Sequence, residues 1–580
     1  MRNNLCMWLA GSAFILAAGC AEQPSSGGED TSTPTIGEET AAPAAGDNVT
    51  AEAGAITTED LRRHIATLAS DEYEGRAPGT PGGEMTRAYI ANEYERIGLE
   101  PIGDSFEQPV PIVESTLDPD QSAFNIALSF GSSYDVVELE YREHAVYWTK
   151  RVEETVRIDS SELVFVGYGV VAPEYDWNDY EGVDVTGKTV VILVNDPGFA
   201  TQDPDLFNGN AMTYYGRWTY KFEEAARQGA AAALIIHDTA PAAYGWGVVE
   251  GSWSGPQVDL QRADNGASRV AVEGWLSNEV AQRFFESAGL DLGEQMQAAL
   301  GDDFQAVPLT GITASAVLHN TITRSEDANV VGVLRGAQRP DEYVLYMGHW
   351  DHLGINPNVE GEDKIYNGAV DNATGIAAIL EVAEKFANNE TAPDRSILFL
   401  AVTAEESGLL GSAYFGEYPT VPLSQIVAGV NIDAILPTPE PKDMIVVGYG
   451  ASELEDILSG VAAEYGRTLT PDPEAEKGYF YRSDHISLAK KGVPMLYADG
   501  GADFVEGGSE AGEALGADYR TNRYHAPSDE YDPSWPMDAM RNTTEILYKT
   551  GAKIAYSDEW PNWYEGNEFR ALRDAQRAGE

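Results

Sequence analysis

From residue 329 onward, short apolar runs alternate with helix-like segments, and this alternation constrains the fold of the 580-residue chain more than any other feature. Buried strands that alternate with helices are typical of an α/β sheet that helices cover on both faces. The sequence therefore predicts such a sheet here. Its strands are expected at 329–334, 343–348, 396–403, 427–432, 443–448 and 493–498, with helices near 374–388, 452–465 and 540–554.

Residues of the types that bind metal ions follow several of these predicted strands. Ligands of open α/β sheets gather beyond the carboxyl ends of the strands. Each motif alone is weak, because an Asp-Asn pair is commonly a turn and a Glu-Glu pair commonly begins a solvated helix. Together they indicate one site, since four of the eight histidines fall within them. The candidates are His349, Asp351, His352, Asp371, Glu405, Glu406, Asp433, Asp484, His485 and His525.

The residue types in these motifs suit zinc. Zinc accepts imidazole nitrogen and carboxylate oxygen. Two zinc ions about 3.5–4 Å apart need a bridging carboxylate, and two histidines with three carboxylates are enough ligands for such a pair. A further carboxylate must stay free of metal to act as a general base.

The order of the motifs resembles the two-zinc aminopeptidase and glutamate carboxypeptidase family of metallopeptidases. The matching motifs are His-x-Asp, Asp-Asn-x-x-Gly, Glu-Glu, Asn-x-Asp and Tyr-His, together with the loop EGRAPGTPG at 74–82. The resemblance covers about 56–125 and 325–555. It implies the zinc exopeptidase fold, a mixed, mostly parallel sheet, for a peptidase domain formed by 56–125 and 321–580. The segment 126–320 resembles a β-rich protease-associated domain inserted into the peptidase domain.

The resemblance also implies a role for each residue. Asp371 is expected to bridge two zinc ions, Glu405 to be the general base, and Asp351 to orient the imidazole of His349. His352 lies outside the common pattern, and both a structural role and a place in the site are open. The terminal ligands implied are His349 and Asp433 for one zinc, and Glu406 and His525 for the other.

The implied activity is metal-assisted hydrolysis of peptides that have a free amino terminus. The zinc ions would lower the pKa of a bridging water and polarise the scissile carbonyl, while Glu405 transfers a proton to the leaving amine. A carboxypeptidase would need cationic residues for the terminal carboxylate, and Arg482, Arg520 and Arg523 lie near site motifs. A glutaminyl cyclase and a non-enzymatic binding protein are further alternatives. The cyclase is usually smaller and lacks the insertion, and the binding protein would need no intact ligand set.

Between the motifs, the segment 126–320 carries no cluster of ligand-type residues. Strands are expected there at 163–171, 188–195 and 230–236, and a helix at 217–228. Its histidines are isolated in the sequence and are interpreted as surface or core residues. They are His144, His237 and His319.

Charge and the amino-terminal segment indicate where the protein works. With 94 acidic and 37 basic residues, its formal charge of −57 repels nucleic acid and anionic membranes. Residues 1–20 are predicted to be a signal peptide whose end, Ala-Ala-Gly-Cys, resembles a bacterial lipoprotein processing site, and an ordinary cleaved signal is the alternative. Residues 21–55 read as a flexible linker. We therefore expect an exported protein, attached to the bacterial cell envelope only through a lipid on Cys20, or secreted.

Overall fold

The computed structural model describes residues 54–130 and 133–579. The predicted signal peptide and nearly all of the predicted linker lie outside these ranges. Within them, no helix combines the length and the apolar character needed to cross a bilayer.

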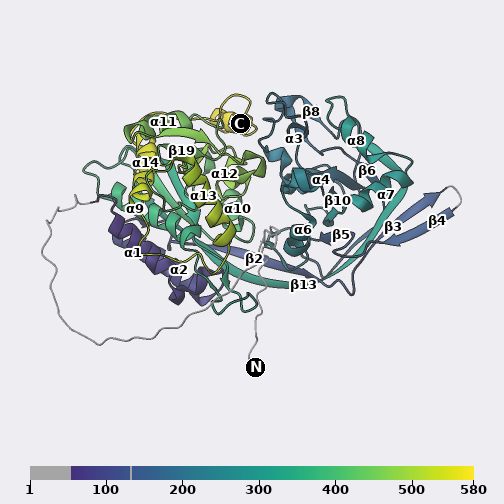
Figure 1. Cartoon of the computed structure of the whole chain (residues 1–580), viewed down its shortest axis with the longest axis horizontal. Helices are drawn as coiled ribbons and strands as arrows, with labels where there is room; N and C mark the ends of the chain where they lie inside the picture. Colours follow the sequence, from purple (N-terminus) through teal and green to yellow (C-terminus); the bar gives the residue numbers. More distant parts are fainter. Residues whose placement is uncertain (1–53, 131–132, 580) are drawn as a thin grey trace, which may run out of the picture.

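The carboxyl-terminal half of the chain forms the sheet expected from the sequence (Figure 1). Four central strands, in the order β17, β14, β18, β21, run parallel to one another. Antiparallel strands β13 and β2 extend one side, and β19, followed by β20, extends the other. The prediction of a mixed, mostly parallel sheet is confirmed. The bounds are β2 (Glu107–Leu117), β13 (Val307–Leu334), β14 (Arg339–His349), β17 (Arg395–Val402), β18 (Ile426–Asn431), β19 (Asp443–Val446), β20 (Thr468–Pro471) and β21 (Met495–Gly500).

Helices cover both faces of this sheet because alternate side chains of each strand point to opposite faces. On β14, Val344 and Tyr346 belong to one hydrophobic cluster, and Leu345 and Met347 belong to the other. Helices α1 (Thr58–Leu68), α2 (Pro81–Ile97), α9 (Gly375–Ala387), α11 (Leu454–Glu464) and α14 (Asp538–Ala555) pack into the first cluster. Helices α10 (Leu410–Glu417) and α12 (His485–Ala489) pack into the second.

A second sheet forms within residues 123–318, which we call the middle segment. Its order is β4–β3–β13–β6–β9–β10–β12–β5, and β6, β9, β10 and β12 run parallel. Helices such as α4 (Trp218–Arg227) and α7 (Asn278–Ser287) pack on it, so the segment is mixed α/β and not purely β-rich. The strands are β3 (Ala123–Phe130), β4 (Ser133–Glu138), β5 (Ala145–Trp148), β6 (Thr155–Phe165), β9 (Thr189–Leu193), β10 (Ala232–Ile236) and β12 (Val272–Leu276).

One long strand, β13, belongs to both sheets. Val317 pairs with Ala123 of the middle segment, and three residues later Asn320 pairs with Leu117 of β2. In Figure 1, β13 and β2 run together between the two halves of the molecule. The sequence predicted a strand only from residue 329, so the expected start of this strand was wrong by more than twenty residues.

Candidate metal centre

Parallel strands deliver the candidate ligands to one edge of the sheet. β14 ends at His349, and the chain continues from β17 to Glu405 and Glu406 and from β18 to Asp433. Gly348 allows a close approach here, because a Cβ on it would lie 2.4 Å from the carbonyl oxygen of Ile432. The end of β14 therefore lies directly beside the backbone that leads to Asp433.

Asp371 contacts two imidazoles through its two carboxylate oxygens. Its Oδ1 lies 3.1 Å from Nε2 of His349, which is also 3.1 Å from Oδ1 of Asp433. Its Oδ2 lies 3.2 Å from Nε2 of His525, which is 3.1 Å from Oε2 of Glu406. The structure thus brings together all five residues predicted as ligands, as two groups of three that share Asp371.

The distances from each of these two imidazoles to its two carboxylates fit zinc. With metal–ligand bonds of about 2.0–2.2 Å, ligand atoms on one tetrahedral zinc lie about 3.3 Å apart, close to the distances observed. No Lys or Arg of the described ranges forms an ion pair with Asp371, Glu406 or Asp433. Three adjacent carboxylates without a lysine or arginine partner favour bound cations.

The candidate ligands differ in how far they are exposed to solvent. The side chains of His349 and Asp371 are 1% and 6% exposed, whereas those of His525 and Asp433 are 17% and 13% exposed. A substrate would therefore approach from the side of His525 and Asp433.

Glu405 is close to the ligands but is not paired with any of them. One carboxylate oxygen of Glu405 lies within 4.8 Å of ligand atoms of His349 and Glu406. Among the described residues, no basic group lies within ion-pair distance of it. Burial raises the pKa of Glu405 well above its usual value. Because no ion pair holds it, the carboxyl group of Glu405 is free to exchange a proton.

Asp351 contacts His349 differently from the expectation. Nδ1 of His349 lies 3.1 Å from the backbone carbonyl oxygen of Asp351 and 3.8 Å from its carboxylate. The carboxylate instead accepts the backbone N–H of Glu405 at 3.1 Å. The backbone carbonyl of Asp351 orients the imidazole, and its side chain positions the start of the Glu-Glu pair.

The turn that carries Asp371 is held by two charged residues whose roles the sequence did not reveal. The buried guanidinium of Arg76 donates to the carbonyl oxygens of Asn367 and Gly368. The Asp529 carboxylate accepts the backbone N–H groups of Val370 and Asp371. The available signal for Arg76 was its place in the loop EGRAPGTPG.

Two neighbouring side chains hold Asp433, the second carboxylate beside His349. Nδ2 of Asn372 donates to the carbonyl oxygen of Ile432 at 3.1 Å, and its Oδ1 accepts the backbone N–H of Ala434 at 3.0 Å. The hydroxyl of Ser483 donates to Oδ2 of Asp433 at 2.6 Å. Ser483 directly precedes the candidates Asp484 and His485 in the chain, so this motif contacts a candidate ligand through its serine.

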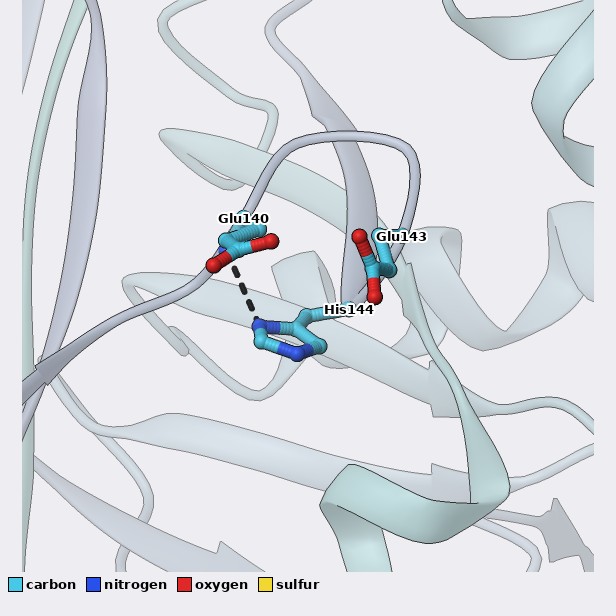
Figure 2. A group of neighbouring side chains, drawn as sticks. All are labelled: Glu140, Glu143 and His144. Carbon is cyan, nitrogen blue, oxygen red and sulfur yellow. Dashed lines mark hydrogen bonds between the residues drawn. The ribbon is translucent and has the colours of Figure 1, made fainter.

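The three isolated histidines, His144, His237 and His319, do not take part in this site. His237 and His319 contact Tyr244 and Thr155. His144 does lie beside two glutamates, Glu140 and Glu143, in the turn before β5 (Figure 2). Both glutamates are exposed, and His144 Nδ1 already accepts the backbone N–H of Glu140 at 3.1 Å.

Comparisons with known proteins agree with this geometry. Residues 329–550 match the model of Peptidase family M28. Aminopeptidase NAALADL1 of Mus musculus is 31% identical over 150 residues, which are 24% of this chain and 18% of that protein. A probable zinc metalloprotease of Pyrenophora teres f. teres is 36% identical over 107 residues, 18% of this chain and 22% of that protein. The chain thus spans about a fifth of the length of these relatives.

A solved aminopeptidase from Aneurinibacillus sp. strain AM-1 is 18% identical, with a TM-score of 0.44 and coverage of 87% of this chain and 95% of that one. The family match at 329–550 includes His349, Asp371, Glu406, Asp433 and His525. Residues 329–550 therefore match Peptidase family M28, and the relationship to zinc aminopeptidases and glutamate carboxypeptidases that the motifs predicted is confirmed.

Proposed function

We propose that the protein is an exported exopeptidase that binds two zinc ions per chain and acts as an aminopeptidase. The observation that carries the proposal is the position of Asp371, which faces His349 with one oxygen and His525 with the other. A carboxylate in that position can serve two metal sites at once.

The residues of the chain divide the catalytic work. Bound zinc ions would supply polarisation of the scissile carbonyl and a lower pKa for water in the site. Glu405 would accept a proton from the attacking water and transfer it to the nitrogen of the leaving amine as the C–N bond breaks. Asp351 would keep Glu405 in place through the backbone N–H of that residue.

The surroundings of the site favour a substrate with a free amino group. Asp433 and Glu405 are carboxylates that can attract an ammonium group. The charge of −57 on the chain favours a cation in any cleft. An acetylated amino terminus has no charge for these groups to bind.

A carboxypeptidase is the second candidate, because one of the three arginines near the site motifs has no acidic partner among the described residues. Arg520 lies 3.6 Å from Glu474 and Arg523 lies 3.4 Å from Asp518, so both arginines already have acidic partners. In the described part of the chain, Arg482 forms no ion pair, and it directly precedes Ser483, which bonds to Asp433.

Arg217 of the middle segment lies close enough to Arg482 for the charge of Arg482 to lower its pKa. Burial, followed by the positive charge of Arg482, lowers the pKa of Arg217 to about 9. The Nε atoms of both arginines are buried and have no hydrogen-bond partner among the described residues. Two guanidinium groups without an acidic partner, in so acidic a chain, could bind a substrate carboxylate.

Two peptides of the same sequence separate the candidates, one acetylated at the amino end and one amidated at the carboxyl end. An aminopeptidase cleaves only the amidated peptide, and a zinc chelator abolishes the cleavage. Release of the carboxyl-terminal residue from the acetylated peptide, lost in Arg482→Ala, would establish the carboxypeptidase instead.

We also propose that the middle segment is a protease-associated module that shapes access to the site. Its contacts with the M28 part support this, since Lys490 Nζ lies 2.6 Å from Glu223 and the backbone N–H of Met212 donates to Ala475 at 3.1 Å. Exchange of residues 123–318 for a short linker should change the preferred peptide length while zinc binding persists. Loss of zinc from a folded variant would argue against the proposal.

For localisation, we propose a lipid anchor on Cys20, which the amino-terminal motif supports. Cys20→Ser should abolish lipid attachment in the exporting host. Mass spectrometry that finds an unlipidated amino terminus, produced by cleavage at another residue, would refute the anchor.

A further inference from the structure

His352 is fully buried beside the candidate metal centre, and the proposed function assigns it no role. Its ring packs on the turn that carries Asp371. A Cβ on Gly368 would lie 2.6 Å from ring carbons of His352, and Gly368 adopts a φ of 56° that favours glycine. The ring is therefore confined between this turn and the Glu-Glu segment.

The contacts of His352 differ from those of the two candidate ligand histidines. Nε2 of His349 and Nε2 of His525 each lie 3.1–3.2 Å from two carboxylates, as expected for atoms that share a metal ion with both. Nδ1 of His352 instead lies 2.7 Å from a single oxygen, Oε1 of Glu406. That distance is typical of a charge-assisted hydrogen bond.

The two oxygens of Glu406 thus have separate partners. Oε1 accepts from His352, and Oε2 faces His525 at 3.1 Å. A carboxylate can only accept in such a contact, so Nδ1 of His352 serves as its hydrogen-bond donor. A fixed donor on one oxygen prevents the carboxylate from rotating and leaves the other oxygen directed at the shared site.

We propose that His352 is a positioning residue that holds Oε1 of Glu406, so that Oε2 is presented to the zinc bound by Asp371, Glu406 and His525. This inference rests on the proposed zinc centre. In this proposal, His352 does not bind zinc itself. The rival interpretation is that Nδ1 of His352 coordinates metal itself, since it lies within 4.8 Å of ligand atoms of Asp371 and Glu406.

Three substitutions distinguish these interpretations by stepwise zinc titration of the metal-free full-length protein against a competing chelator. His352→Asn places an amide donor where Nδ1 lies, His352→Gln places it near Nε2, and His352→Leu removes it. Loss of a hydrogen bond to a metal ligand typically weakens metal binding about 10–100-fold. In His352→Leu and His352→Gln, we expect the affinity for one of the two zinc ions to fall by this amount while the other stays unchanged. In His352→Asn, we expect both zinc affinities to stay within about threefold of the wild type.

Matched variants identify the zinc affected. His525→Ala should lose the same zinc that His352→Leu weakens, whereas His349→Ala should lose the other. Thermal unfolding of the metal-free His352→Leu variant should stay close to that of the wild type, which separates positioning from general destabilisation.

Three results would overturn the inference. Unchanged affinities in His352→Leu would leave His352 a packing residue, and an equal loss in Asn, Gln and Leu variants would make its ring a ligand. If His352→Leu weakened the zinc that depends on His349 instead, His352 would not act through Glu406. A wild-type protein that binds only the zinc dependent on His525 would refute the two-zinc proposal yet still test His352, while one that binds none would refute both.

Discussion

The carboxylate of Asp529 accepts the backbone N–H of Asp371 at 3.1 Å, so a residue 158 positions later in the chain holds the turn that carries the shared carboxylate. Asp529 also accepts the N–H of Val370 at 3.1 Å, and its own carbonyl accepts the N–H of Ala369 at 3.0 Å. Because it lies four residues after His525, it connects the segments that carry two candidate ligands.

Asp529→Ala should therefore destabilise the fold and weaken both zinc sites. Two buried N–H groups would lose their acceptor, and each such loss costs about 1–3 kcal/mol. We expect the free energy of unfolding of the metal-free protein to fall by about 2–5 kcal/mol in urea titrations. Full stability together with wild-type affinity for both zinc ions would show that the turn keeps its shape without Asp529. Asp532→Ala is a suitable control, because this nearby carboxylate caps an exposed turn.

Glu405→Gln should lose activity but keep both zinc ions, whereas Glu406→Gln should bind one zinc ion more weakly. An amide at 405 cannot accept a proton, so peptide cleavage should fall about 10²–10⁴-fold while both zinc ions stay bound. An amide at 406 removes a charged ligand, so one zinc should be weakened. Activity assays and elemental analysis of the same preparations check both. The reverse pattern would exchange the roles of the two residues.

A buried carboxylate away from the metal centre should make stability depend on pH. Glu381 of α9 lies 3.4 Å from the buried His64 of α1, and burial, aided by the nearby charges of Asp60 and Glu384, raises the pKa of Glu381 to about 8. A raised folded-state pKa gives stability that is complete below the unfolded value of 4.5 and is lost as pH rises toward 8.

Glu381→Gln mimics the protonated acid and should remove this loss. Relative to the wild type, the variant should gain on the order of 3 kcal/mol in unfolding free energy between about pH 5 and pH 8. His64, whose pKa burial lowers to about 4, is present in both proteins, so its own direct effect largely cancels in the comparison. A difference that does not change with pH would mean that Glu381 is ionised in the folded protein.

The sequence predicted the parts of the fold that depend on buried apolar runs. The central strands β14, β17 and β18 are buried on both faces, and their continuous apolar runs made them recognisable. The first part of β13 was missed because it alternates with exposed polar residues in a long ribbon. Helix α13 (Gly508–Asn522) was missed because three glycines weaken its pattern and it buries only two residues.

In the candidate site, too, some residues could be predicted from the sequence and others could not. Residue types and order were enough to select His349, Asp371, Glu406, Asp433 and His525, which the structure brings together. Arg76 and Asp529 could not be assigned roles, since they act on backbone groups whose positions only the fold determines. The contact between His352 and Glu406 likewise depends on how two loops pack.

Asp371 is the ligand that the two proposed zinc sites share. Zinc content per chain, measured for the wild type and for Asp371→Ala after equilibration with the same free zinc concentration, tests this directly. We expect two zinc ions in the wild type and loss of both in the variant, because each group of three would lose a member. Asp371→Ala that still retains one tightly bound zinc, or a wild type that never binds more than one, would contradict it.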